Sequence, residues 1–258
     1  EDHFVAPDPA NATIMVGVGL PHQNGTNGDD IVFGDDTANT ISTNDGNNSV
    51  VAGGGDALVN GGNQSDLIFG GTDNDILNAN SGDDSVSGGT GNAKLYDAGG
   101  DDKLLAGDGD DLVEAGDGND TVNAGAGNDT VQGEGGDDCI AGGKDDGTIA
   151  GSIQTGLQVT LGDELFGNGG ADQFDYRSGD GVDFLFDFKA SDGDTLKSVC
   201  VDVDYVEFVT VNTAFGPAGG IAIDADDDGE FEGGIFFQQI RDPNEFQQLI
   251  NTGVIEFL

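Results

Sequence analysis

Ala115-Gly-Asp-Gly-Asn-Asp-Thr-Val-Asn123 and Ala124-Gly-Ala-Gly-Asn-Asp-Thr-Val-Gln132 are consecutive and almost identical nine-residue segments of a 258-residue chain. Blocks of this kind follow one another from Gly25 to Ala150, fourteen in all, without insertion or deletion. A fixed period over so long a stretch indicates a repeat architecture, in which each unit gains stability by stacking on its neighbours.

The pattern is clearest at the eighth and sixth places of the block. The eighth place is aliphatic in all fourteen blocks, which predicts one side chain per block that points into a common core. The sixth place is Asp in nine blocks, the fourth place is Gly in ten, and the fifth is Asn or Asp in twelve. The eighth-place residues are Val32, Ile41, Val50, Val59, Ile68, Leu77, Val86, Leu95, Leu104, Val113, Val122, Val131, Ile140 and Ile149. The sixth-place aspartates are Asp30, Asp66, Asp75, Asp84, Asp102, Asp111, Asp120, Asp129 and Asp138.

The pattern predicts that each block is a six-residue turn followed by a three-residue strand. Glycine allows the positive φ angles and close chain approaches that such turns need. A three-residue strand is too short to be stable alone, so it must stack on copies of itself, about 4.8 Å apart. Two blocks then form one coil of eighteen residues with a turn at each end.

The block is similar to the nonapeptide Gly-Gly-x-Gly-x-Asp-x-U-x, where U is aliphatic, and the chain therefore resembles the RTX (repeats-in-toxin) family over about half its length. The resemblance implies an all-β fold, a right-handed parallel β-roll (β-solenoid). It also implies several Ca²⁺ ions held between turns by sixth-place carboxylates and backbone carbonyls. Hard oxygen ligands on bent loops are what Ca²⁺ prefers.

Because stacked turns lie two blocks apart, the sixth places should form two rows. The first row reads Asp30, Asn48, Asp66, Asp84, Asp102, Asp120, Asp138. The second reads Asn39, Ala57, Asp75, Ala93, Asp111, Asp129, Gly147. The first row offers four pairs of successive aspartates and the second only one. We therefore expect calcium to load one edge of the roll more fully, and the N-terminal coils to bind it poorly.

The repeat breaks at residues 151–157 and recovers in Gln158–Phe166 and Gly167–Asp175, where Asp163 and Asp172 take the sixth place. The predicted organisation is an N-terminal cap over residues 1–24, the calcium-binding β-roll over 25–175, and a β-rich C-terminal cap over 176–258. In the N-terminal part, Thr13–Leu20 is expected to form a strand that covers the first coil.

The C-terminal part is rich in phenylalanine and alternates like strand at Val182–Phe188, Gly220–Asp224 and Gly234–Ile240. A short helix should begin after Asp242, with Pro243 and Glu245 in its first turn, and a last strand should follow it. The segment resembles the C-terminal caps of RTX proteins, which lie near an uncleaved secretion signal. Its acidic turn is either a further calcium site or a simple hairpin, with Asp224, Asp226 and Asp228 as the candidate ligands.

The charge predicts that the fold needs the metal. Acidic residues number 50 against 7 basic ones, for a formal net charge of −43. Packed carboxylates repel one another, and one aliphatic side chain per block buries little apolar surface. We expect the repeat to be largely unfolded without calcium and to fold cooperatively when calcium neutralises and cross-links the turns.

Composition also limits the partners. Such acidity excludes nucleic acid, and no apolar run is long enough to span a bilayer. Residue 1 is Glu rather than Met, so either a cleaved leader or a longer precursor is expected. The two cysteines, Cys139 and Cys200, are far apart, and their spacing leaves open whether they pair.

No catalytic motif is present, so the first hypothesis is a non-enzymatic protein that is part of an extracellular surface, filament or matrix. The family resemblance implies bacterial type I secretion and folding outside the cell, and a stiff rod would favour self-association. The alternative is a C-terminal folding and export module of a larger secreted protease, lipase or epimerase. An adhesin that binds a surface polysaccharide is a third hypothesis. Ice binding is disfavoured because the seventh places are irregular.

Overall fold

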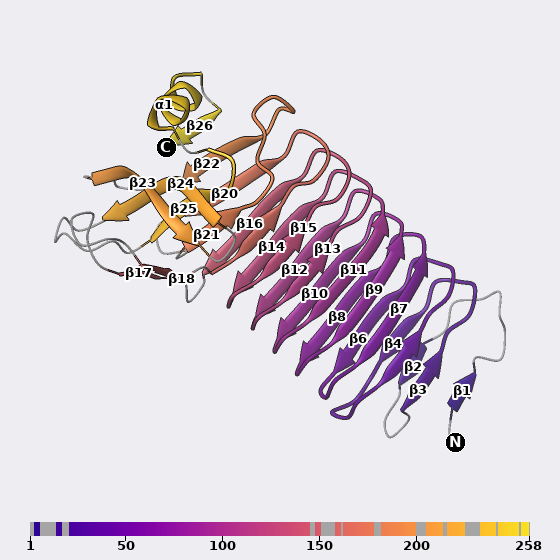
Figure 1. Ribbon diagram of the computed structural model, residues 1–258. Helices are drawn as coiled ribbons and strands as arrows, with labels where there is room; N and C mark the ends of the chain where they lie inside the picture. Colours follow the sequence, from indigo (N-terminus) through magenta and orange to yellow (C-terminus); the bar gives the residue numbers. More distant parts are fainter. Residues whose placement is uncertain are drawn as a thin grey trace. The chain divides into compact units, whose positions relative to one another are not determined.

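The computed structural model describes residues 3–5, 14–16, 21–144, 148–150, 158–160, 162–177, 182–199, 205–213, 216–224, 233–240, 242–252 and 254–257. In this part the chain is all-β apart from one nine-residue helix, and it forms a parallel β-solenoid, which confirms the predicted fold class (Figure 1). It divides into two compact units, residues 1–124 and 125–258, which are described separately.

The first unit consists of short strands that alternate between two sheets. One sheet has the order β1-β3-β5-β7-β9-β11-β13 and the other β2-β4-β6-β8-β10-β12. Neighbours are parallel and two blocks apart, as in the register Val50↔Ile68, so the eighteen-residue coil is confirmed. The strands are β1 (His3–Val5), β2 (Ile14–Val16), β3 (His22–Asn24), β4 (Ile31–Phe33), β5 (Thr40–Ser42), β6 (Ser49–Gly53), β7 (Leu58–Asn63), β8 (Leu67–Thr72), β9 (Ile76–Ser81), β10 (Ser85–Thr90), β11 (Lys94–Gly99), β12 (Lys103–Asp108) and β13 (Leu112–Glu114). The next strand, β14 (Thr121–Ala126), contains the boundary of the unit.

The core of the first unit is a column of eighth-place side chains, all of them buried as predicted. The strands β7 to β12 are six residues long rather than three, because pairing continues into the first three places of the next block. Alternation along a strand then turns the first-place residue inward too, and Ala79 and Ala106 are buried. At the second place of the fifth block only glycine fits: Gly62 has φ +127°, and a Cβ there would lie 1.4 Å from the Asn44 carbonyl oxygen.

Strand pairing continues on the N-terminal side of Gly25. The strand β2 lies inside the expected Thr13–Leu20 segment and pairs in parallel with β4. The strand β3 pairs with β5 in the register Gln23↔Ile41, which places Gln23 in the core column. This buried amide donates to Asn39 Oδ1 at 3.4 Å, a polar contact that the aliphatic pattern did not predict.

The second unit also has two sheets of mainly parallel strands, and it adds antiparallel strands. Its sheet orders are β15-β19-β21-β25-β24-β23 and β16-β20-β22-β26, with β17 and β18 as a separate antiparallel pair. The elements are β15 (Thr130–Gln132), β16 (Cys139–Lys144), β17 (Thr148–Ala150), β18 (Gln158–Thr160), β19 (Glu164–Phe166), β20 (Gln173–Arg177), β21 (Val182–Leu185), β22 (Thr195–Val199), β23 (Tyr205–Thr213), β24 (Gly216–Asp224), β25 (Gly233–Phe237), α1 (Pro243–Asn251) and β26 (Ile255–Phe257).

One expectation about the repeat was wrong. The fourteenth block, Gly142–Ala150, was expected to stack like the others, but its strand β17 pairs antiparallel with β18. The next strand of the roll on that side is β19, in the register Thr130↔Glu164. This block carries Gly147 at the sixth place, so it has no side chain there to bond to a neighbouring coil.

The C-terminal elements agree with the sequence. Strands β21 and β26 fall in the segments predicted to be strand, β24 contains the predicted Gly220–Asp224 and begins four residues earlier, and β25 overlaps the predicted Gly234–Ile240. The helix α1 begins at Pro243, and the Asp242 side chain accepts from the backbone N–H of Asn244 at 2.9 Å, the predicted N-cap. The core of this unit is aromatic, with Phe236 and Phe237 buried and the Phe246 ring of α1 packed 6.1 Å from that of Phe237.

Candidate metal sites in the aspartate ladder

The sixth-place side chains form a hydrogen-bond ladder along each row, which we call the aspartate ladder. Along each row, the Oδ1 atom of an aspartate accepts the backbone N–H of the sixth-place residue one coil earlier, at the following six steps. In the first row the acceptor is Asp66 for Asn48 (2.7 Å), Asp84 for Asp66 (2.6 Å), Asp102 for Asp84 (2.6 Å) and Asp120 for Asp102 (2.8 Å). In the second row it is Asp75 for Ala57 (2.8 Å) and Asp111 for Ala93 (2.7 Å). The first-unit members of the two predicted rows are therefore brought together in the predicted order.

The ladder has a structural role that requires no ion. A backbone N–H in a turn of this kind is buried, and leaving it without an acceptor costs about 1–3 kcal/mol. Asn48 can replace aspartate in the ladder because its Oδ1 also accepts, from the Asp30 N–H at 2.9 Å. The alanines at Ala57 and Ala93 have no such oxygen and interrupt the second row.

The other carboxylate oxygen has no such partner. The Oδ2 atoms of Asp66, Asp75, Asp84 and Asp102 are buried and accept no hydrogen bond within the described part of the chain. At most 4 % of each of these residues is exposed to solvent. A buried oxygen that carries charge and lacks a donor is costly, and a bound cation removes the cost. The donor set consists of hard oxygens alone, so these residues fit Ca²⁺.

The electrostatics of the metal-free ladder agree with this reading. Burial raises the pKa of Asp66 to about 7, with a smaller contribution from the nearby Asp84 carboxylate and against the lowering effect of the Asn48 hydrogen bond. Burial likewise raises the pKa of Asp75 and of Asp111 to about 6. The fold thus holds these carboxyl groups where the charged form is disfavoured until a positive charge is supplied.

The first place of each block lies beside the sixth-place carboxylate. A Cβ at Gly61 would lie 2.4 Å from Asp66 Oδ2, and a Cβ at Gly70 would lie 2.5 Å from Asp75 Oδ2. The Gly70 position also lies close to the Gly88 carbonyl oxygen of the next coil, 2.6 Å from that Cβ. Carboxylate and carbonyl oxygens of two coils therefore share one small volume, and they would hold the ion together.

The second unit contains the same ladder across the inserted hairpin. The Asp129 N–H donates to Asp163 Oδ1 at 2.8 Å, and the Asp138 N–H donates to Asp172 Oδ1 at 3.0 Å. Asp163 and Asp172 are therefore part of the ladder, as their predicted sixth places suggest, but their partners are 34 residues away rather than the expected 18. Burial raises the pKa of Asp172 to about 6.

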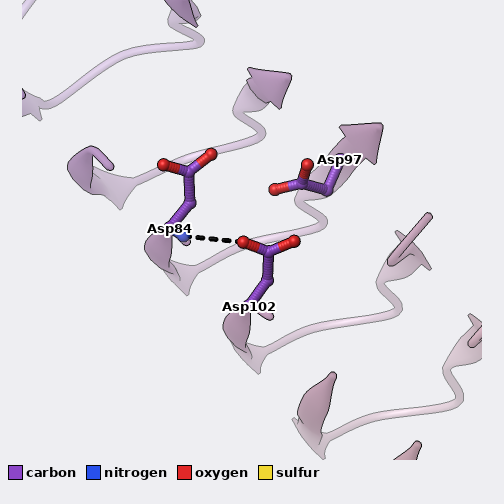
Figure 2. A group of neighbouring side chains, drawn as sticks. All are labelled: Asp84, Asp97 and Asp102. Carbon is purple, nitrogen blue, oxygen red and sulfur yellow. Dashed lines mark hydrogen bonds between the residues drawn. The ribbon is translucent and has the colours of Figure 1, made fainter. Parts of the chain in front are cut away.

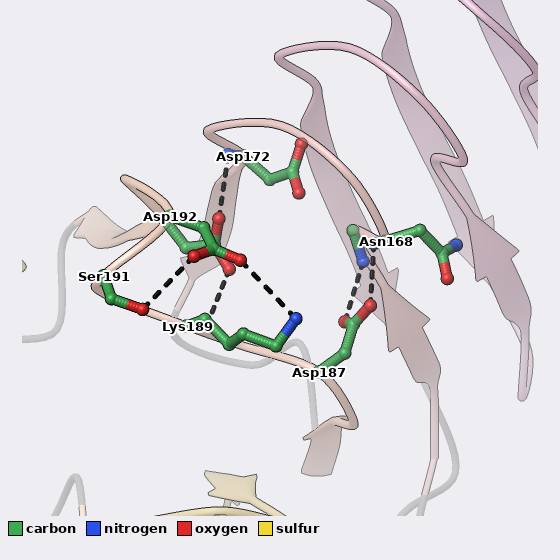
Figure 3. A network of polar contacts seen from close by, with 8 residues as sticks. Asn168, Asp172, Asp187, Lys189, Ser191 and Asp192 are labelled. Carbon is green, nitrogen blue, oxygen red and sulfur yellow. Dashed lines mark hydrogen bonds and ion pairs between the residues drawn. The ribbon is translucent and has the colours of Figure 1, made fainter.

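The last coil has a ladder residue that was not among the predicted ligands. Asp194 Oδ1 accepts from the Asp172 N–H at 3.2 Å, and its Oδ2 accepts from the Lys189 N–H at 2.7 Å (Figure 3). The spacing of Asp194 and Leu196 matches the sixth and eighth places and could have identified it. Both oxygens of Asp187 likewise accept hydrogen bonds, from the N–H groups of Gly167 and Asn168 at 3.0 and 2.7 Å.

The first aspartate of the row is also supplied with protein donors. Asp30 Oδ2 accepts from the Thr26 N–H at 2.6 Å, and the Thr26 hydroxyl lies 3.1 Å from both carboxylate oxygens. Ion binding at Asp30 or Asp194 would have to replace such bonds, whereas at Asp66, Asp84 and Asp102 it would not. This contrast favours the middle coils as the ion-binding region.

Sequence reasoning missed one residue in the middle coils, Asp97. It occupies a first place, and its carboxylate lies beside those of Asp84 and Asp102 (Figure 2). Burial, followed by the charge of Asp102, raises the pKa of Asp97, and burial also raises that of Asp102. Asp97 could have been found as the one acidic residue at a place otherwise occupied by small ones.

Several predicted features lie outside the described residues. Asp226 and Asp228 are among them, and of Asp224 only the backbone at the end of β24 is described. The proposed calcium turn therefore stays a prediction. Cys139 is a free thiol whose pKa is raised by burial, and Cys200 is not described. No helix among the described residues is long and apolar enough to cross a membrane.

The repeat matches a known family model. The model of the RTX calcium-binding nonapeptide repeat (4 copies) matches residues 24–59, 60–95, 87–122, 96–131 and 114–149. The chain is a member of the RTX nonapeptide-repeat family. The family binds calcium through this repeat, in agreement with the buried and unpartnered ladder oxygens.

Other comparisons add little to this assignment. Among solved structures, an extracellular lipase, LipA from Serratia marcescens, is similar with a TM-score of 0.27 and 11% identity. The alignment covers 91% of this RTX chain and 39% of the lipase, so the chain spans about two fifths of that protein's length. A search of curated proteins found no match.

Proposed function

We propose that this RTX protein is a secreted, non-enzymatic calcium-binding β-roll that contributes to an extracellular surface, filament or matrix. The observation that carries the proposal is the set of buried Oδ2 atoms of Asp66, Asp75, Asp84 and Asp102, which have no donor among the described residues. Catalytic carboxylates are few and face a substrate cleft, whereas these four recur at the same place of the repeat block along the roll. Their regular spacing is that of a structural metal array.

The energetics of the metal-free chain support the proposal that it is secreted. RTX repeat proteins are typically secreted by bacteria, and the cytosol holds little free calcium. With a net charge of −43 and no ion, the ladder carboxylates disfavour the folded state. The chain would pass through the export machinery unfolded and would fold where calcium is abundant, because ion binding and folding are coupled.

An exposed apolar patch supports a role in assembly. It lies on the outer face of the β4, β6 and β8 strands and consists of Ile31, Phe33, Val51, Leu67 and Phe69, each 39 to 42 % exposed. The strand register places Phe33, Val51 and Phe69 side by side. Contiguous apolar residues on a flat sheet are typical of a protein contact surface, here a second copy of the chain.

Three measurements test the proposal. Circular dichroism and calorimetric titration should show cooperative folding with binding of several Ca²⁺ ions, and sedimentation velocity in calcium should show concentration-dependent association. The substitution Phe69→Ser should weaken the association, whereas Leu58→Ser, on the other sheet and 37 % exposed, should not. A monomer at all concentrations would refute the assembly part, and a chain that folds equally well in chelator would refute the calcium part.

The alternative, a folding and export module of a larger secreted enzyme, makes a different prediction about the natural product. A native species much heavier than this chain, with catalytic sequence attached, would replace the proposal with that alternative. Mass spectrometry of material secreted by the source organism distinguishes the two.

A further inference from the structure

Asp97 is an exception to the repeat. The first place of the other thirteen blocks is Gly, Ala or Thr, and only here is it acidic. The place lies next to the sixth-place carboxylate of its own block, as the glycine positions of other coils show. A carboxylate at this place therefore enters the volume in which the ladder oxygens already lie.

The backbone around Asp97 is adapted to the side chain. The pairing of β11 with β9 shifts register between Tyr96 and Asp97 and again between Asp97 and Gly99. Asp97 Oδ1 accepts the N–H groups of Ala98 at 2.5 Å and Gly99 at 3.1 Å. These two bonds fix the carboxylate, while its Oδ2 is buried and without a hydrogen-bond partner among the described residues.

Three such oxygens converge at this point. Carboxylate oxygens of Asp84, Asp97 and Asp102 all lie within 4.8 Å of one another (Figure 2). In each residue Oδ1 accepts a backbone N–H, and in each Oδ2 is buried and unpartnered. Asp84 and Asp102 are only 4 % and 3 % exposed. Ionised carboxylates are acceptors only, so the three cannot satisfy one another.

No lysine or arginine forms an ion pair with these three carboxylates in the part of the chain that the structure describes. Among the described residues the ion pair found is that of Lys189 with Asp192, in the other unit. Three buried acceptors of like charge without a counter-charge require a bound cation or a proton held between them. Three carboxylates with nearby carbonyl oxygens form a donor set typical of a hard divalent cation and exceed the two that a ladder pair offers.

We propose that Asp84, Asp97 and Asp102 form a three-carboxylate site for a hard divalent cation, Ca²⁺ first of all, with the first-place side chain of Asp97 as a direct ligand. The inference rests on the proposed binding of calcium by the ladder and adds a distinct class of site to it. Because ligand charge tunes calcium affinity, this site binds more tightly than the pair Asp66 and Asp84 one coil earlier. It is the position at which ion loading of the first unit begins.

A neighbouring tyrosine allows the site to be observed by itself. Tyr96 precedes Asp97 directly, and the only other tyrosines of the chain are Tyr176 and Tyr205 in the second unit. Excited tyrosine transfers energy to nearby Tb³⁺, an ion that occupies calcium sites. The part of the Tb³⁺ emission that disappears in Tyr96→Phe therefore reports binding close to Asp97.

The experiment is a Tb³⁺ titration with competition by Ca²⁺, carried out on the full chain, on Asp97→Ala, on Asp97→Asn and on Asp117→Asn, a control that removes one exposed charge. Each of these four is also titrated with Tyr96→Phe added, so that the Tyr96-dependent emission is obtained as a difference in every background. Alanine occupies the first place in five other blocks, so Asp97→Ala should fold, and circular dichroism in calcium checks this. The Tyr96-dependent emission should saturate first in the parent chain. Its midpoint should shift about tenfold or more to higher concentration in both Asp97 variants and remain in place in Asp117→Asn.

The outcomes separate the inference from the proposed function. Identical Tyr96-dependent titrations of the parent chain and Asp97→Ala would overturn the inference while leaving calcium binding by the ladder intact. A crystal structure with ions in the ladder but with Asp97 Oδ2 outside 2.3–2.6 Å of any of them would do the same. Absence of all Tb³⁺ emission, with no calcium-dependent folding, would instead overturn the proposed function.

Discussion

Replacing Asp66 in two ways separates the two roles that the ladder gives to each aspartate. The Asp66 Oδ1 atom accepts the buried Asn48 N–H at 2.7 Å, and its Oδ2 is the oxygen available to an ion. Asp66→Asn removes the charge but retains an acceptor, and Asp66→Ala removes both. The natural Asn48 shows that asparagine fits the place, because its Oδ1 accepts from Asp30 at 2.9 Å and its Nδ2 donates to the Gly46 carbonyl at 2.9 Å.

The expected magnitude follows from the lost bond. In Asp66→Ala the Asn48 N–H stays buried without an acceptor, at a cost of about 1–3 kcal/mol relative to Asp66→Asn. Both variants lose the same carboxylate, so the loss of ion binding cancels in the comparison. In a chain of this size we expect the Ala variant to unfold at roughly 1 M less urea than the Asn variant.

The assay is urea unfolding followed by circular dichroism in saturating calcium. The same pair of substitutions at Asp36, whose side chain is exposed, serves as the control and should differ by less than about 0.5 kcal/mol. If the Asn and Ala variants at Asp66 unfold at the same urea concentration, the ladder bond contributes nothing and the reasoning fails. If the Asn variant is the less stable one, the assignment of Oδ1 as an acceptor is wrong.

Three further predictions follow from the same geometry. Removing calcium should unfold the repeat at pH 8 but less completely at pH 5. In the folded state the pKa values of Asp66 and Asp75 are about 7 and 6, against an ordinary value of 3.8, so the folded chain holds protons that the unfolded chain has released. The stability of the calcium-free fold therefore falls as pH rises between about 4 and 7. Circular dichroism in calcium-free buffer across this range tests it, and greater order at pH 8 would contradict it. Ala93→Asp should fill a gap in the second row and add about one Ca²⁺ ion per chain by titration calorimetry, whereas Ala93→Asn should add only the hydrogen bond to its neighbour and no ion. Gly62→Ala should destabilise the roll by about 3 kcal/mol or more because of the positive φ at this residue and the overlap of the new Cβ with Asn44. The control is Gly169→Ala, whose Cβ would meet the chain no closer than 3.5 Å. Equal thermal unfolding midpoints for the two variants would refute the account.

Much of the fold was readable because a nine-residue period is a local property. The aliphatic eighth place and the glycine-rich turns specify the strand, the coil length and the inward side chain, and neighbours two blocks apart follow from these. The helix N-cap at Asp242 was equally local. The fourteenth block was misread because its sequence still fits the period loosely, while its strand β17 pairs with β18 outside the roll.

The sequence by itself determined the β-roll, its core column, the two rows of aspartates and their suitability for calcium, because all of these depend on which residue types recur at which place. Only the tertiary structure decided which carboxylate oxygens are free. That depends on donors from other coils, such as the N–H groups of Gly167 and Asn168 that bond to the two oxygens of Asp187. It also depends on the meeting of three carboxylates, since Asp84 and Asp102 lie 13 and 5 residues away from Asp97 in the chain. The positions of these donors and acceptors are set by the stacking of successive coils, which brings together residues that are far apart in the sequence.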